Sequence, residues 1–462
     1  MAKKLKPRHS SVGPPPMSDS GMLASADSVA ASSLATGAVA AAARADRSAA
    51  SVEGPQARAI GSAVASSGRP EAEPLRLSDR ARALRPSLTL AIAAKAKQLR
   101  AEGRDICSLS AGEPDFDTPA FIRQAAARAL ENGHTRYGPA AGEPALREAI
   151  AEKLSRENHV PTRADQVLVT NGGKQALYNL FQVLLGPGDE VLLPAPYWLS
   201  YPEIARLAGA SVRVLASEAA QGFRLDPQQL ERAITPASKL LVLNSPGNPT
   251  GMVLSRPELE AVAAVLRRHP QVAVVCDEIY EFLLAPGHVH HSFAAVAPDL
   301  ADRIFTVNGF AKGWAMTGWR IGWLAGSQTV VAAASALQSQ TTSNVCTFAQ
   351  YGALAAVEGS RSCVQEMAAQ FNQRRTLLTE GLMALPGLMI QPPEGAFYAF
   401  PDVSAYGLDS MTLCSRLLDA VGLAVVPGVA FGDDRCIRLS CAASPATIQD
   451  GLARLQRFLV GL

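Results

Sequence analysis

One lysine of this chain stands in a setting that favours nucleophilic chemistry. Lys312 and Arg320 lie eight residues apart in a stretch rich in Gly and Trp, which follows an apolar run. An ammonium group in apolar surroundings holds its proton less tightly, which is the condition for a lysine that forms a Schiff base. The guanidinium of Arg320 could bind a phosphate through two parallel hydrogen bonds. The alternative is a surface lysine whose stem lies along structural tryptophans.

Two glycine-containing motifs would suit anionic or amide-bonding ligands. Gly172 and Gly173 precede the helix predicted over 174–185, so the backbone can turn there and the helix can offer free N–H groups to a phosphate. Asn248 lies in the Pro- and Gly-rich loop 244–251 after another apolar run, at the sheet edge where α/β proteins bind ligands. In each case the alternative is a plain turn.

A carboxylate and a phenol complete the set. Asp277 ends a strongly apolar run, and Tyr280 follows it. Because an isolated buried carboxylate is costly, a cation must face Asp277, unless this residue caps the next helix. A phosphate cradle, a carboxylate, a Tyr and an Asn able to bond a phenolate, and an imine-forming amine together describe the needs of one cofactor, pyridoxal phosphate.

Several motifs occur in an order that makes chance similarity implausible. They lie at 110–119, 136–142, 171–178, 196–202, 248–251, 277–280, 312–322 and 438–440. Through them, from about Arg82 to its C-terminus, the chain resembles the class I aminotransferases of pyridoxal-phosphate fold type I, and most closely the prokaryotic-type aspartate aminotransferases.

The resemblance implies catalytic roles for three residues. Lys312 corresponds to the lysine that forms the Schiff base with the cofactor and carries the proton as general base and acid. Asp277 corresponds to the carboxylate that keeps the pyridine nitrogen protonated. Tyr280, together with Asn248, corresponds to the donors to the phenolic oxygen.

The resemblance also implies how the rest of the cofactor is held. Gly172, Gly173 and Arg320 correspond to the phosphate-binding residues, and Trp198 to the aromatic ring stacked on the cofactor. Tyr137 corresponds to a tyrosine that reaches the cofactor phosphate of the neighbouring subunit. A homodimer with shared active sites is therefore expected.

One position departs from many relatives. Gly309 and Phe310 stand where those proteins carry a Ser shortly before the lysine. One hydroxyl contact to the phosphate is therefore expected to be missing, although the branch that uses acidic substrates tolerates small residues there.

The substrate contacts are implied in the same way. Arg438 corresponds to the arginine that grips the α-carboxylate, a task for which Lys is less suited. Ser87 and Thr89 resemble hydroxyls of a mobile N-terminal segment that contact the distal carboxylate, although they could instead cap the helix that follows. Lys174, in the cofactor loop, is similar to a lysine that binds the same carboxylate. Further substrate contacts are expected from Gly112, Trp198 and Asn248.

These residues lead us to expect an aspartate aminotransferase. It would transfer the amino group between L-aspartate and 2-oxoglutarate by a ping-pong mechanism, giving oxaloacetate and L-glutamate. The alternatives are a related transaminase that uses prephenate, an aromatic amino acid or alanine, and a carbon–sulfur β-lyase. The aminotransferase-like effector domain of a transcription regulator is less well supported, because the N-terminal segment offers no amphipathic helix pair and little positive charge.

The periodicity predicts an α/β fold. Seven short apolar runs between 166 and 324 alternate with helical segments, which predicts a large domain with a mostly parallel seven-stranded sheet and a smaller α+β domain after it. Long helices are expected over 174–185, 256–268, 329–357 and 362–385. The expected division is a disordered Ala/Ser-rich extension (1–75), a segment joining the small domain (76–115), a large cofactor-binding domain (116–360) and a small domain (361–462).

Composition excludes several other classes of protein. The 462 residues carry a formal net charge of +2, which argues against a nucleic-acid or membrane-surface protein. No run is long and apolar enough for a membrane span. The seven dispersed cysteines form no C-x-x-C pair and suit a reducing cytoplasm. Organelle targeting through the N-terminal extension is the alternative, but its acidic residues oppose it.

A metal site is not expected. His288, His290 and His291 have a suggestive spacing, but the sequence places no Cys or suitable set of carboxylates with them.

Overall fold

The computed structural model describes residues 75–84 and 87–461. Residues Leu75–Leu462 make up one compact unit. The expected disorder of residues 1–75 falls almost wholly outside the described residues, and the other expected domain bounds stay predictions. Among the described helices, none combines the length and apolar character that a membrane crossing requires.

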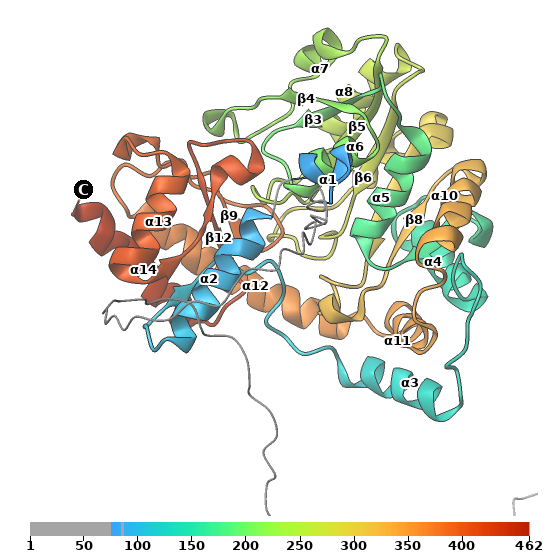
Figure 1. Cartoon of the computed structure of the whole chain (residues 1–462), viewed down its shortest axis with the longest axis horizontal. Coiled ribbons are helices and arrows are strands. Elements are labelled where there is room, and N and C mark those ends of the chain that lie inside the picture. Colours follow the sequence, from blue (N-terminus) through green and yellow to red (C-terminus); the bar gives the residue numbers. More distant parts are fainter. Residues whose placement is uncertain (1–74, 85–86, 462) are drawn as a thin grey trace, which may run out of the picture. The chain divides into compact units, whose positions relative to one another are not determined.

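A seven-stranded sheet forms the centre of this unit, in the order β2-β8-β7-β6-β5-β3-β4 (Figure 1). Its strands are β2 (Val167–Thr170), β3 (Glu190–Pro194), β4 (Ser211–Leu215), β5 (Ser238–Asn244), β6 (Ala273–Asp277), β7 (Ile304–Gly309) and β8 (Gly322–Ala325). All neighbouring pairs from β4 to β7 are parallel, and only β8 runs against its two neighbours. The predicted fold class and mostly parallel sheet are confirmed, because each apolar run became one of its strands.

Helices cover both faces of the sheet, as alternate residues of β5 show. Leu240 and Val242 pack beneath α5 (Gly173–Leu184), α6 (Ser200–Leu207) and α10 (Gln328–Thr341). Leu241 and Leu243 point the other way and pack against α8 (Arg256–Arg267). Such two-sided burial explains why the strands read as continuous apolar runs. A capping box of Ser255 and Glu258 fixes the start of α8.

Other helices complete the layers around the sheet. Against its β2 and β8 end pack α3 (Ala120–Glu131), α4 (Pro144–Glu157) and α11 (Thr347–Glu358). The described chain also forms α1 (Asp79–Ala83), α7 (Pro227–Ala233) and α9 (Phe293–Val296).

The C-terminal part has a separate, smaller set of strands. β9 (Tyr398–Ala399), β11 (Val426–Pro427) and β12 (Ile437–Ser440) form an antiparallel sheet in the order β11-β12-β9, while β1 (Cys107–Ser108) pairs in parallel with β10 (Leu423–Ala424). The helices of this part are α2 (Leu88–Ala101), α12 (Ser362–Met383), α13 (Ser410–Val421) and α14 (Pro445–Val460). Figure 1 shows α2 beside β9 and β12, and its Ile92 packs against the core cluster that contains Phe400 and Phe431.

The prediction of one helix over 329–357 is wrong. The segment folds as two helices, α10 and α11, separated at Thr342–Cys346. Ser343 adopts a left-handed conformation with φ 59°, and its amide donates to the carbonyl of Gln338. Because no Gly or Pro marks this turn, the helical periodicity runs through it in the sequence.

The two-sided burial of the sheet predicts a stability difference between neighbouring parts of it. Leu241→Ala should lower the free energy of unfolding by about 3 kcal/mol, because Leu241 is fully buried and truncation leaves a cavity. Val214→Ala, on the edge strand β4, should cost less than about 1 kcal/mol, because Val214 is 46% exposed. Urea unfolding followed by circular dichroism measures both, and equal losses would contradict the layered arrangement.

Candidate active site

The parallel strands bring the predicted site residues to one edge of the sheet. Asn244, the last residue of β5, is the register partner of Asp277, the last residue of β6, and Asp277 is paired with Val307 of β7. The loops that carry Asn248, Tyr280 and Lys312 therefore leave the sheet side by side. Carboxyl edges of parallel strands are where open α/β sheets bind ligands.

Lys312 lies half-buried at this edge, against apolar rings. Its Nζ donates to the carbonyl oxygen of Gly112 at 2.6 Å and lies 5.8 Å from the ring centroid of Phe397. Burial lowers the pKa of Lys312 to about 8, an effect that Glu113 opposes and the guanidinium of Arg438 reinforces. A lysine with this pKa is partly neutral near physiological pH and can act as a nucleophile or a base.

Asp277 is buried and held by hydrogen bonds. Its Oδ2 accepts from the hydroxyl of Tyr201 at 2.8 Å, and its Oδ1 accepts from the amide of Ile279 at 3.3 Å. Burial raises the pKa of Asp277 to about 6, although these two bonds oppose the rise. The carboxylate can therefore pair with a cationic group and would keep that group protonated.

Tyr280 and Asn248 are both buried near Asp277. The hydroxyl of Tyr280 is 3.0 Å from that of Tyr398, and its ring packs edge-on against Phe397. The backbone N–H of Asn248 donates to Oδ1 of Asn244 at 2.8 Å. The side-chain Oδ1 of Asn248 accepts from Arg438 at 3.0 Å. The loop of Asn248 is therefore fixed from two sides.

Arg438, on β12, is a buried cation without an anionic partner in the described part of the chain. It is 2% exposed and donates to Asn248 Oδ1 and, at 3.1 Å, to the carbonyl oxygen of Ser110. Its guanidinium lies 4.4 Å from the ring centroid of Tyr398, and its Nε has no acceptor. Burial lowers the pKa of Arg438. Such a group favours an incoming carboxylate.

The start of α5 forms a second anion-binding feature. Gly172 caps the helix with φ 81°, and in the described part of the chain no side-chain hydrogen bond caps this end. A Cβ at Gly172 would lie 2.7 Å from Arg320 Nη2, so the arginine lies directly against this glycine. A Cβ at Gly322 would meet the amide nitrogen of Gly173 at 2.6 Å. Glycine at these positions lets Arg320 and the helix terminus meet.

Lys174, Trp198 and Tyr137 are three further residues of the predicted site. Lys174 Nζ is 4.9 Å from the ring centroid of Trp198, and burial lowers the pKa of Lys174, as does Arg320. Tyr137 is 92% exposed.

The predicted hydroxyls of the N-terminal segment are not joined to these residues by any described hydrogen bond. Ser87 stands at the N-cap of α2 but makes no capping bond, and its Oγ is instead 2.9 Å from Oγ1 of Thr89. The alternative prediction, that the side chain of Ser87 caps the helix that follows, is therefore wrong. Both hydroxyls are half-buried.

Phe310 explains the absence of a hydroxyl before the lysine. It is fully buried, with ring centroids 5.3 Å from Trp314 and 5.1 Å from Trp323. The residue thus belongs to the core behind the sheet rather than to the ligand-binding edge.

Sequence reasoning missed the residues that hold the site together. Tyr201 binds Asp277, Tyr398 binds Tyr280, and Asn244 donates to the carbonyl oxygen of Asp277 at 2.9 Å. Tyr201 lies in the motif 196–202, but nothing in the sequence indicates that it contacts Asp277, 76 positions away.

The prediction from the sequence that no suitable set of carboxylates lies near the three histidines is wrong. Glu278, Glu281 and His290 present ligand atoms within 4.8 Å of one another. However, both carboxylate oxygens of Glu281 already accept from Lys153, at 2.5 and 2.6 Å. A divalent cation would have to displace or face this ammonium, so the cluster is better described as an ion-pair network.

Comparisons with known proteins agree on one family. The model for aminotransferase class I and II matches residues 104–455. The aspartate/prephenate aminotransferase of Thermus thermophilus is 47% identical over 386 residues, covering 83% of this chain and 98% of that protein. A bifunctional aspartate aminotransferase and glutamate/aspartate-prephenate aminotransferase from Petunia hybrida is 45% identical over 397 residues, covering 83% of each.

Solved structures give the same result. The aspartate aminotransferase from Thermus thermophilus with maleate superposes with a TM-score of 0.80 at 47% identity, covering 83% of this chain and 99% of that chain. The aspartate aminotransferase from Rhizobium meliloti gives a TM-score of 0.81 at 37% identity, covering 84% and 99%.

The environment of Lys312 predicts an unusual pH dependence. In protein freed of bound ligands, acylation of Lys312 should rise with a midpoint near pH 8, because the neutral amine reacts and the ammonium does not. The side-chain amine of free Nα-acetyl-lysine in the same mixture should titrate near the ordinary pKa of about 10.4. Competitive labelling with mass spectrometry measures both, and coinciding midpoints would show that Lys312 is fully hydrated.

Proposed function

This chain belongs to the class I and II aminotransferases, and from that membership we propose that it is a pyridoxal-phosphate-dependent aspartate aminotransferase. Its substrates would be L-aspartate and 2-oxoglutarate, and its products oxaloacetate and L-glutamate. The names of the relatives from Thermus thermophilus and Petunia hybrida support aspartate as the amino donor.

One observation carries the proposal. Lys312 and Arg438 hold the same short segment, because Lys312 donates to the carbonyl of Gly112 and Arg438 to that of Ser110. Two residues of chain span at most about 7 Å. An amine of lowered pKa therefore lies close to a guanidinium that has no anionic partner among the described residues, which is the arrangement needed to act on the amino end of an amino acid.

The residues at the sheet edge fit pyridoxal phosphate. The open N-terminus of α5, the glycine at 172 and Arg320 suit the phosphate, and a side chain at 172 would fill that space. Asp277 is buried and suits the pyridine nitrogen, while Tyr280 and Asn248 would face the phenolic oxygen. Trp198, two residues before α6, would stack on the ring.

Each residue then has a definite task. When bound, pyridoxal phosphate supplies a carbonyl group that accepts the amino group and a protonated ring that stabilises the charge left at Cα. Arg438 would orient the α-carboxylate by two parallel hydrogen bonds, and Lys312 Nζ would remove the proton from Cα of the substrate and later return one. Asp277 would hold the proton on the ring nitrogen. Lys174 would bind the distal carboxylate of aspartate.

We also propose a homodimer in a reducing compartment such as the cytoplasm. Tyr137 is almost fully exposed in the single chain, so its ring is free to meet a partner subunit. All seven cysteines are free thiols.

The central experiment follows the absorbance of bound cofactor while aspartate is added without an oxo acid. The band should shift to that of the pyridoxamine form, and Lys312→Ala should abolish the shift, with a rate loss of several orders of magnitude. Lys239→Ala is the matched control, because Lys239 lies in β5 with a half-exposed side chain paired to Asp189. A band that responds to phenylalanine, alanine or cystathionine but not to aspartate would refute the proposed substrate.

A second experiment tests how the distal carboxylate is recognised. Lys174→Gln should raise KM for aspartate about tenfold while the reaction of alanine changes less than about twofold, because alanine has no distal carboxylate. Steady-state rates with 2-oxoglutarate measure both. Equal losses for the two amino acids would assign Lys174 to the cofactor instead. Prephenate, tested as an acceptor with glutamate, decides whether a larger dicarboxylate is also used.

A further inference from the structure

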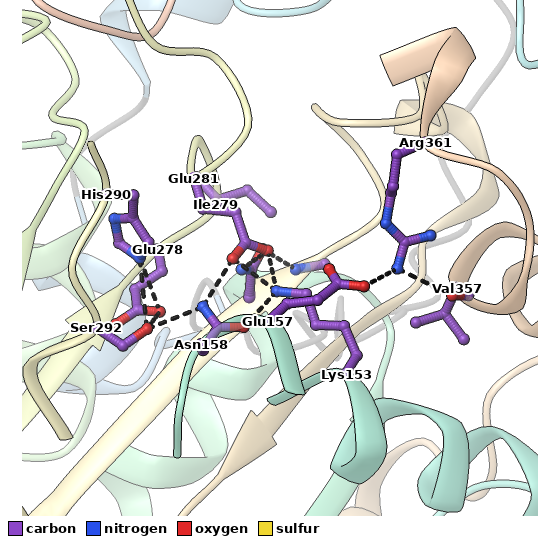
Figure 2. A network of polar contacts seen from close by, with 12 residues as sticks. Lys153, Glu157, Asn158, Glu278, Ile279, Glu281, His290, Ser292, Val357 and Arg361 are labelled. Atoms are coloured by element: carbon purple, nitrogen blue, oxygen red, sulfur yellow. Dashed lines mark hydrogen bonds and ion pairs between the residues drawn. The ribbon is translucent and has the colours of Figure 1, made fainter. Parts of the chain in front are cut away.

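Lys153 and Glu281 form a buried ion pair close to the proposed active site in sequence, because Glu281 lies four residues after Asp277 (Figure 2). Lys153 of α4 and Glu281 are 1% and 5% exposed. The ammonium donates to both oxygens of Glu281 and, at 2.7 Å, to Oδ1 of Asn158. Its three donors thus meet three acceptors, and the charge is compensated within the core.

Glu281 joins the two loops that bear the proposed catalytic residues. It follows Tyr280 directly, in the loop that leaves β6 after Asp277. Its Oε1 also accepts from Nδ2 of Asn308, in β7, at 2.8 Å. Asn308, four residues before Lys312, in turn accepts from the backbone amide of Gly309 at 2.7 Å through its Oδ1. One carboxylate therefore ties the Asp277 loop to the strand end that leads to Lys312.

The same network reaches Glu278, the neighbour of Asp277. Asn158 donates to Glu281 Oε2 and to the hydroxyl of Ser292, both at 2.9 Å. Ser292 donates to Glu278 Oε2 at 2.7 Å, and His290 Nε2 lies 3.2 Å from the same oxygen. Figure 2 shows this chain of contacts running from Lys153 to His290. The residues on both sides of Ile279 and Tyr280 are anchored by it.

Stability alone does not account for such a pair. Desolvation of two charges commonly cancels their attraction, and well-packed apolar residues of the same volume serve as well or better. What apolar residues would not supply is direction, because four hydrogen bonds to one carboxylate fix its position in space.

We propose that Lys153 and Glu281 are positioning residues, which act through Asn308 and the loop after β6 to set where Lys312 stands relative to Asp277. The inference rests on the proposed function for its catalytic meaning. Its geometric content, the placement of the Lys312 amine, is measurable without cofactor or turnover.

Two variants test the inference, each in the full-length protein. Asn308→Ala removes the tether between the loops but keeps the ion pair of Lys153 and Glu281. Lys153→Met removes the cation and leaves Glu281 unpaired. Arg454→Met is the matched control, because Arg454 is a similarly buried cation whose hydrogen bonds, within the described residues, go to Asp450, Asp105, Val421 and Gly422.

The first readout is the midpoint of Lys312 acylation in protein freed of cofactor. Asn308→Ala and Lys153→Met should each move it upward by about 0.5 to 1 pH unit, because a displaced Lys312 is better hydrated. In the loaded enzyme, kcat for aspartate should fall about tenfold while KM stays within about threefold, since substrate contacts are retained. Arg454→Met should lower the melting temperature and change neither readout.

The outcomes separate the two claims. If the midpoint moves in both variants but the wild type has no transaminase activity, the proposed function fails and the positioning role stands. If the wild type is active and Asn308→Ala retains both its midpoint and its kcat, the network is merely structural and the inference is wrong. A shift of the same size in Arg454→Met would also overturn it. Should Lys153→Met not fold, Asn308→Ala decides alone.

Discussion

The pairing of β5, β6 and β7 is the constraint on which the site depends. The three strands are parallel and in register, so Asn244, Asp277 and Val307 lie at one level of the sheet, and β7 runs two residues further to Gly309. Apolar runs buried on both faces set that register, since a slip of one residue would turn Leu240 and Leu241 to the wrong layers. Core packing far from any ligand therefore decides where Asp277 and Lys312 stand. The C-terminal strand β12 adds Arg438 to the same place from a separate sheet.

Local sequence was enough to predict which residues do chemistry, but not which residues hold them in place. Lys312, Asp277 and Gly172 lie in motifs whose composition is unusual within a few positions, so their roles could be inferred before any fold was known. Tyr201 and Tyr398 act through single hydroxyl contacts to residues 76 and 118 positions away. Such contacts leave no local pattern, because any buried tyrosine seeks a partner for its hydroxyl.

The fold shows the same division between local and tertiary causes. The seven strands could be predicted since each is a short apolar run between turn residues. The break between α10 and α11 could not, because Ser343 takes up a left-handed conformation without a glycine and the turn is held by tertiary bonds. One of these comes from Gln175 of α5, whose Nε2 donates to Oγ1 of Thr342 at 2.7 Å. Glu278 and Glu281 were likewise not connected with His290, although the chain folds back to bring them together.

Charge is distributed differently on the two sides of the strand ends. Behind them, the ammonium of Lys153 is matched by the carboxylate of Glu281. In front, Lys174, Lys312, Arg320 and Arg438 form no ion pair among the described residues, and Asp277 is the buried acid among them. Grouping unpaired cations is unfavourable in the free protein, which is why burial and mutual repulsion lower the pKa values of Lys174 and Lys312. The binding of anions relieves that cost. A phosphate at α5 and two carboxylates on the substrate would neutralise these cations, so under the proposed function the same electrostatics that is unfavourable in the free site would favour a phosphorylated cofactor and a dicarboxylic amino acid.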